Sequence, residues 1–477
     1  MRPVFAHAPT LTVNLFCAAV ARMALGKTLI RLGALISVAT LTGCGMAPAS
    51  AVTALPAATP AWEAVTTSAS DPTVLPATAI PTPSPIPTPT LPPPTVTPTS
   101  DLLSLDERLQ IFDEVWRIVD EKYLYADFGG VDWEGLYPEY RARVVQAQSR
   151  DEFYAVMIDL VAQLNDNHSR FVPPAAVEAE DATASGREIR VGIGVIVQPK
   201  PDGGFVQQVF PESPAARADI RPRDRIIAVN GRPYTASDGD LQGAVGTSVR
   251  LTIARPGAKL RDVLLTRQEV RSSILPYYRR FPGDIGYVSV PTLWVHDMGE
   301  QVSGALTDLV AGGPLRGLIL DLRSNRGGWG DVLSAVLSHF VRGQVGVFFG
   351  RDYVRPLVIN PPAGPDLRNL SAGLVVLVDE DTASYAEVMA AVLQSEAQAI
   401  VVGTHSAGNT ETIYAHALRD GSRLWLAQEG FRLRNGSNLE GRGVVPDVLL
   451  DVDWTRYSED DDPQLLEALR LLGGGPK

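Results

Sequence analysis

The stretch Leu374-Val-Val-Leu-Val-Asp-Glu-Asp-Thr-Ala-Ser-Tyr-Ala-Glu-Val388 decides how the second half of the chain folds. Its apolar start predicts a buried strand over 374–378, and the acidic turn after it leads into a helix over 385–393. Ser384 therefore stands where a strand gives way to a helix, and a helix N-terminus stabilises negative charge that develops nearby. A serine in this position can attack an acyl carbon if a base removes its proton. It can also simply cap the helix, because Ser384 and Glu387 have the spacing of a capping box.

Strands and helices alternate on both sides of this stretch. We expect strands over 285–290, 318–322 and 399–403, helices over 299–310 and 331–341, and 447–453 could add a last strand. Such alternation is typical of an α/β core with a mainly parallel sheet. We place this core at 270–453 and expect a C-terminal helix and tail over 454–477.

Two regions of different pattern precede the core. Residues 101–180 carry apolar residues at spacings of three and four, which predicts a helical N-terminal region. Residues 187–269 read instead as short strands, with a hairpin turn at Asn230-Gly231. The fold class is therefore multidomain α/β, with a helical region and a β-rich module ahead of the core.

The β-rich module resembles a PDZ domain. Such a domain takes an extended C-terminal peptide as an added strand and holds its carboxylate on loop N–H groups. The stretch Gly192-Ile193-Gly194 opens the first strand, so the resemblance implies substrate binding there. Asp219 and Arg223 stand where such modules usually carry glycine, and we expect this turn to be reshaped because arginine tolerates a left-handed conformation poorly.

Composition excludes several classes of function. The chain has 477 residues and a formal net charge of -12, which argues against a nucleic-acid partner or an electrostatic membrane patch. Of its two cysteines, neither lies beyond Cys44, so the folded part can hold no disulfide, cysteine nucleophile or thiolate metal site. No His/Cys/Asp cluster stands at ligand spacing, so we expect no metal and no cofactor.

The N-terminus looks like a targeting segment. Lys27 and Arg31 precede an apolar stretch over 32–41 that ends in Leu41-Thr-Gly-Cys44, which resembles a bacterial lipoprotein signal. This predicts a signal peptide over 1–43, a lipid on Cys44 and a Pro/Thr-rich disordered spacer over 44–100. The protein would then lie outside the cytoplasm, anchored to a bacterial cell membrane by lipid alone. A plain secretory signal is the alternative, and the start could be Met23 instead of Met1.

Four motifs in order carry a resemblance to a known family. Asp166-Asn-His-Ser169 precedes the PDZ-like module, and Asp321-Leu-Arg-Ser-Asn-Arg-Gly-Gly328, Thr382-Ala-Ser-Tyr-Ala-Glu387 and Gly443-Val-Val-Pro-Asp447 follow it. This order resembles the C-terminal processing (tail-specific) serine peptidases, over nearly the whole chain from residue 105 onward. The resemblance implies a serine-type endopeptidase that acts on protein or peptide C-termini.

The resemblance also assigns roles to residues. Ser384 would be the nucleophile, and the backbone N–H groups of Gly327, Gly328 and Tyr385 would form the oxyanion hole. The family's usual base is a lysine after glycine, but this chain has Gly408-Asn409 at that place. An asparagine cannot take the proton. No lysine occurs between Lys259 and Lys477, so a Ser/Lys dyad is excluded from the core.

A histidine base is the remaining possibility. In the related tricorn-type peptidases, a histidine of the N-terminal motif acts as base with a glutamate before the final motif, which here implies His168 and Glu440. An acid that orients an imidazole, which in turn deprotonates a serine, has the logic of a serine triad. His405 is an alternative base, because it lies four residues before Asn409.

We therefore expect an exported serine endopeptidase that cuts unfolded or C-terminally exposed proteins. An inactive peptidase-derived scaffold that binds peptides is the alternative, and Asn409 is the observation that favours it. A weaker alternative is an esterase, which would use the same oxyanion hole on a smaller ester. Arg323 and Asn325 are expected to brace the oxyanion turn.

Overall fold

The computed structural model describes residues 102–184, 189–235 and 241–473. The expected signal peptide and spacer lie outside these residues. No helix in the described ranges combines the length and the apolar character that crossing a membrane requires.

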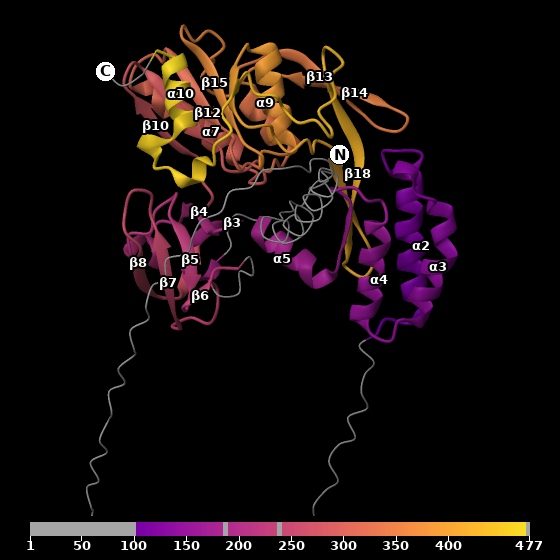
Figure 1. The fold of residues 1–477 in the computed structure, drawn as a ribbon. Helices are drawn as coiled ribbons and strands as arrows, with labels where there is room; N and C mark the ends of the chain where they lie inside the picture. The colour runs from indigo at the N-terminus through magenta and orange to yellow at the C-terminus, as the bar shows by residue number, and fades with distance from the viewer. Residues whose placement is uncertain (1–101, 185–188, 236–240, 474–477) are drawn as a thin grey trace, which may run out of the picture. The chain divides into compact units, whose positions relative to one another are not determined.

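Three helices form the first region: α2 (Leu105–Lys122), α3 (Trp133–Gln146) and α4 (Arg150–Ala162). Ser104 begins α2 through a capping box with Glu107, which satisfies two backbone donors that a helix start leaves unpaired. The apolar faces of the three helices pack on one another and on Leu424 and Leu426 of the long strand β18 (Arg423–Leu433). The region ends in β1 (Arg170–Val172), which pairs with β18, and in α5 (Pro174–Ala184) (Figure 1).

The second region is a small β-rich module. Its elements are β2 (Ile189–Gly192), β3 (Val195–Lys200), β4 (Gly203–Val209), α6 (Pro214–Arg217), β5 (Arg225–Val229), β6 (Arg232–Pro233), β7 (Ser248–Ala254), β8 (Arg261–Thr266) and β9 (Gln268–Arg271). The main sheet has the order β3-β4-β5-β7-β8, so β3 is an edge strand. An edge strand of this kind is able to accept a further strand.

The turn after α6 keeps the backbone that glycine would favour. Asp219 and Arg223 both adopt a positive φ, 56° and 73°. Arg255 donates to the Asp219 carboxylate, and Arg223 donates to the buried carboxylate of Asp462 at 3.0 Å. The expected reshaping of this turn is therefore not seen, because side-chain contacts hold the two residues in a conformation that L-residues rarely adopt.

The core contains a six-stranded sheet of order β10-β11-β12-β15-β16-β19. Its strands are β10 (Tyr277–Phe281), β11 (Ile285–Ser289), β12 (Gly317–Asp321), β15 (Gly373–Val378), β16 (Ile400–Gly403) and β19 (Val448–Leu449). Only β10 is antiparallel to its neighbour, so the expected, mainly parallel α/β core is confirmed.

Helices cover both faces of this sheet, as a parallel sheet requires. The helices α7 (Met298–Ala311), α8 (Gly330–Leu337) and α9 (Tyr385–Glu396) pack with Leu320 and Val376 on one face. The helix α10 (Pro463–Leu471) packs with Ile319 and Leu377 on the other face (Figure 1). Because successive side chains of a strand point to opposite faces, the continuous apolar run of β15 contributes side chains to the apolar clusters on both faces of the sheet.

A second sheet was not expected from the sequence. It has the order β1-β18-β13-β14, built from β13 (Gly343–Phe349) and β14 (Val354–Ile359), and β17 (Thr412–Ala417) also pairs with β18. The long strand β18 thus joins the helical region to the core. This pairing places the 165–169 loop, which precedes β1, close to the segment that leads into β17.

Candidate active site

Ser384 is held in a strained backbone conformation between β15 and α9. Its φ and ψ are 57° and -131°, a combination that non-glycine residues rarely adopt and that is found at exposed nucleophiles. Its N–H donates to the backbone oxygen of Asn409 at 2.6 Å and to Glu387 Oε2 at 3.0 Å. Ser384 and Glu387 form the predicted capping box, and the Glu387 N–H also donates to the Ser384 backbone oxygen at 2.9 Å. Ser384 lines a cavity as well, so its place at the start of the helix is compatible with a role as nucleophile.

Glu387 fixes the turn that carries the serine. Besides the Ser384 N–H, its carboxylate accepts from the Ser406 hydroxyl at 2.6 Å and from the N–H groups of Gly408 and Asn409 at 2.7 and 2.9 Å. The side chain is 0% exposed. One buried carboxylate thus ties the start of α9 to the 406–409 loop.

The three residues predicted for the oxyanion hole lie at this turn, but their N–H groups differ in whether they already donate a hydrogen bond. The Gly327 N–H donates to Asn325 Oδ1 at 2.9 Å, so it is already engaged. Within the described part of the chain, the N–H groups of Gly328 and Tyr385 have no hydrogen-bond partner. Donors left unpaired beside a nucleophile are what an oxyanion hole requires. The geometry therefore favours Gly328 and Tyr385 as the donors, with Gly327 in a spacing role.

That spacing role explains the glycine at position 327. A Cβ atom there would stand 2.6 Å from the Ser384 Cβ and 2.9 Å from the Tyr385 nitrogen. Its φ of 79° is also one that glycine adopts at no cost. Asn325 braces the turn as expected, because its buried amide also donates to the Val290 oxygen at 2.8 Å.

His168 is buried next to two carboxylates. Its loop is held by Asp166, which accepts the N–H of His168 at 2.8 Å. The His168 side chain is 6% exposed, and its Nε2 lies 3.5 Å from Glu411 Oε2 and 3.6 Å from Glu440 Oε1. The structure thus brings together the predicted pair, His168 and Glu440, and adds Glu411, which the sequence did not single out.

The environment separates the pKa values of these groups. Burial alone would lower the pKa of His168, but Glu440, Glu411 and Asp166 together outweigh burial and raise it above the ordinary value. Burial raises the pKa of Glu411 to about 7, although His168 and the Tyr125 hydroxyl oppose the change. Burial would also raise the pKa of Glu440, yet the contacts with His168 and Thr410 lower it overall. Glu440 is therefore the carboxylate that stays ionised beside the imidazole.

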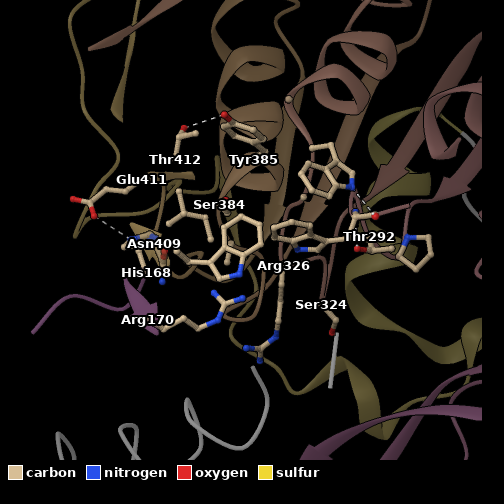
Figure 2. Close-up of a pocket in the computed structure, with 18 of the residues that line it drawn as sticks. His168, Arg170, Thr292, Ser324, Arg326, Ser384, Tyr385, Asn409, Glu411 and Thr412 are labelled. Carbon is tan, nitrogen blue, oxygen red and sulfur yellow. Dashed lines mark hydrogen bonds and ion pairs between the residues drawn. The ribbon is translucent and has the colours of Figure 1, made fainter. Parts of the chain in front are cut away.

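Ser384 and His168 line one cavity of about 360 Å3, together with Asn409 and Glu411. Figure 2 shows His168, Asn409 and Glu411 on one side of this cavity, beyond Ser384, and Ser324 and Thr292 on the other. Because His168 Nε2 faces the carboxylates, its Nδ1 is the nitrogen left to approach the serine. No hydrogen bond joins Ser384 to His168 in the structure as described, and such contacts often tighten only when substrate binds.

The cavity also has an aromatic wall that sequence reasoning missed. Trp294, Trp329 and Trp425 line it, with ring centroids 5.0 Å apart for the first two and 6.3 Å apart for Trp294 and Trp425. The edge strand β3 contributes Ile196 and Val197. An apolar cleft of this size with a few polar groups is suited to an organic ligand such as a peptide.

The other possible bases are placed less well. His405 is exposed and does not line the cavity. Lys200 of β3 lies outside the core and forms ion pairs with Asp381 at 2.8 Å and Glu380 at 3.5 Å. Burial would lower the pKa of Lys200, but these acidic groups outweigh burial and raise it. Lys200 therefore stays protonated and cannot act as a base.

Comparisons with known proteins agree with this geometry. Residues 284–450 match Peptidase family S41, residues 104–162 match the Tricorn protease C1 domain, and residues 205–255 match a PDZ domain. The core is a serine-type peptidase of family S41. The predicted family and architecture, with a helical region and a PDZ domain ahead of the peptidase core, are thereby confirmed.

Relatives of this S41 peptidase carry a consistent description. The "Carboxyl-terminal-processing protease" of Synechocystis sp. is 26% identical over 393 residues, which cover 79% of this chain and 90% of that protein. The "Carboxyl-terminal-processing peptidase 2, chloroplastic" of Arabidopsis thaliana is 28% identical over 380 residues, 74% of this chain and 71% of that protein. A solved structure, the photosystem II D1 C-terminal processing protease, aligns with a TM-score of 0.52 and 27% identity over 74% of this chain and 95% of that one.

Proposed function

We propose that this S41 peptidase is an endopeptidase that cuts unfolded or C-terminally exposed proteins and uses His168 as its base. The observation that carries the proposal is His168, buried in the Ser384 cavity beside two carboxylates, while Asn409 stands where the family's lysine would be. An imidazole next to an ionised carboxylate takes up a proton readily, because the carboxylate stabilises the imidazolium that forms.

The chemical step follows from these positions. Ser384 Oγ attacks the scissile carbonyl carbon as His168 removes the hydroxyl proton, and Glu440 stabilises the resulting imidazolium. The N–H groups of Gly328 and Tyr385 donate hydrogen bonds to the carbonyl oxygen as negative charge develops on it. His168 then returns the proton to the leaving amine, and water releases the acyl group from Ser384 by the same route.

Tail capture would precede this step. The stretch Gly192-Ile193-Gly194 and the start of the edge strand β3 line a small apolar groove with Phe210 and Leu241. The far half of β3, at Ile196–Pro199, lines the Ser384 cavity. A peptide that adds to β3 would therefore run from the groove toward the nucleophile.

The location is also part of the proposal. The apolar stretch before Cys44 and the spacer over 44–100 support an exported protein held to a bacterial membrane by lipid. Substrates would then be proteins of the cell envelope with exposed or unfolded C-terminal segments.

Digestion of casein by the full chain tests the proposal. The parent should digest casein, Ser384→Ala should not, and His168→Ala should slow cleavage by about 10² or more, as expected for loss of a general base. His405→Ala serves as the matched control and should keep the parent rate. If His405→Ala abolishes cleavage while His168→Ala does not, the base is His405. If the parent cleaves no unfolded protein yet still binds peptide tails, the peptide-binding scaffold is the correct function.

A further inference from the structure

Three ligand atoms from distant parts of the sequence converge beside Ser384. His168 Nε2 lies 3.5 Å from Glu411 Oε2 and 3.6 Å from Glu440 Oε1, and the three ligand atoms all lie within 4.8 Å of one another. Their spacing along the chain hides this cluster, because the histidine precedes the PDZ domain and both glutamates follow it. The expectation of no metal site rested on that spacing alone.

The remaining atoms of the two carboxylates are held in place. The Tyr125 hydroxyl donates to Glu411 Oε1. The Thr410 N–H and hydroxyl donate to Glu440 Oε2 at 2.6 and 3.1 Å. Outer partners of this kind orient metal ligands and fix which oxygen faces the ion. Glu411 Oε2 and Glu440 Oε1 are therefore the atoms directed at the histidine.

Two of the three converging atoms have no hydrogen-bond partner. His168 Nε2 and Glu411 Oε2 are fully buried and unbonded, on side chains that are 6% and 3% exposed. Buried polar atoms are nearly always bonded, since leaving one unpaired costs roughly 1–3 kcal/mol. The 3.5 and 3.6 Å separations are too long for strong hydrogen bonds.

The same separations fit a bound cation. In a tetrahedral zinc site, metal–nitrogen and metal–oxygen bonds of about 2.0–2.2 Å place neighbouring ligand atoms about 3.4 Å apart. One imidazole and two carboxylates form a donor set that zinc accepts, whereas calcium and magnesium prefer oxygen ligands alone. Three protein ligands leave a fourth position for water.

We propose that His168, Glu411 and Glu440 form a site for zinc or a similar divalent transition-metal ion, and that the bound ion switches the peptidase off. Binding exchanges the ion for protons held by the cluster, which pass to solvent. A histidine that binds the ion through Nε2 carries its proton on Nδ1, the nitrogen left to face Ser384. It then has no free electron pair to accept the Ser384 proton. The inhibition rests on the proposed role of His168, whereas the binding site does not.

Calorimetric titration of the full chain with zinc chloride tests the site itself. The protein is the Ser384→Ala variant after treatment with EDTA, which is removed before titration, so no turnover is needed for the readout. We expect one zinc ion per chain that is lost, or bound at least tenfold more weakly, in a Ser384→Ala/Glu411→Gln double variant. Tyr125→Phe removes only the outer partner of Glu411 and should weaken binding by about 10–100-fold. Glu380→Gln removes an exposed carboxylate outside the cluster and should leave the affinity unchanged.

Peptidase assays test the switch. Zinc should stop casein cleavage by the otherwise unaltered chain, and EDTA should restore it, with the Tyr125→Phe variant requiring more zinc for the same inhibition. The proposed zinc site would be overturned if the Glu411→Gln and Tyr125→Phe variants bound zinc as tightly as their parent. It would also be overturned if the parent bound no zinc at 100 µM. Zinc binding that depends on Glu411, in a chain that cleaves nothing in EDTA, would support the site and refute the peptidase function separately.

Discussion

Replacing Glu387 with glutamine is expected to destabilise the core and disable the nucleophile together. The Glu387 carboxylate is fully buried and accepts four hydrogen bonds, from the Ser384, Gly408 and Asn409 N–H groups and from the Ser406 hydroxyl. Glutamine has the same shape but offers only one acceptor oxygen. The side-chain NH2 group of glutamine would replace one carboxylate oxygen. It would point its own hydrogens at two of these four donors and could not accept from them.

The size of the effect follows from the bonds lost. Two hydrogen bonds to a charged acceptor contribute about 1.5–3 kcal/mol each, so their loss costs about 3–6 kcal/mol. A neutral amide is easier to bury than a carboxylate, which moves the net cost toward the lower end, about 3 kcal/mol. The Ser384 N–H is one of the donors, so its strained backbone would relax and casein cleavage should fall with stability.

Urea unfolding followed by tryptophan fluorescence measures the free energy of unfolding. Glu396→Gln, on the same helix, is the matched control, because its ion pair with Arg434 lies at the surface and such pairs contribute about 0–1 kcal/mol. A Glu387→Gln variant that unfolds within about 1 kcal/mol of the parent, with full activity, would refute this reasoning.

Three further outcomes are expected. Arg323→Met should cost about 3–5 kcal/mol in urea unfolding, because the fully buried guanidinium pairs with Asp321 at 2.6 Å and Asp462 at 2.8 Å. Its removal leaves the buried Asp321 carboxylate without its cation, whereas Asp462 keeps Arg223. A loss below about 1 kcal/mol contradicts that account. In EDTA, cleavage should rise with pH through one ionisation above the ordinary histidine value of about 6.5, because the base must be neutral and neighbouring carboxylates outweigh burial to raise the pKa of His168. A rise centred below that value, or near the lysine value, would be inconsistent with this base. Peptides with a free C-terminal carboxylate should bind the full-length Ser384→Ala variant more tightly than their amidated forms in fluorescence anisotropy, and equal binding would argue against carboxylate capture.

The elements around the nucleophile could be predicted because their signals are local. The apolar run that became β15 and the helix after Ser384 are encoded within about fifteen residues, and the family motifs place the serine directly. The PDZ domain was likewise visible in its strands and turns. Its Asp219-to-Arg223 turn was misjudged, because the contacts that hold a positive φ there come from Arg255 and Asp462, far along the chain.

The rest of the site depends on pairings between distant segments. Glu411 has no signal of its own, and it reaches His168 only because β1 and β17 both pair with β18. The sequence also could not show which of the three predicted N–H groups are free to form the oxyanion hole. The Gly327 N–H is excluded only because the Asn325 side chain is oriented to accept its hydrogen bond. Such side-chain choices follow from packing, which residue spacing does not reveal.

Labelling with a fluorophosphonate, which phosphonylates activated serines with loss of fluoride, tests the central claim most directly. The full chain, in EDTA, should gain one adduct, located at Ser384 by mass spectrometry and absent from Ser384→Ala. The His168→Ala variant should be labelled about 10² or more times more slowly than the parent. The labelling rate of the Glu440→Gln variant should fall less, because the base itself remains. No adduct on the parent, an adduct on another residue, or parent-rate labelling of His168→Ala would contradict the account.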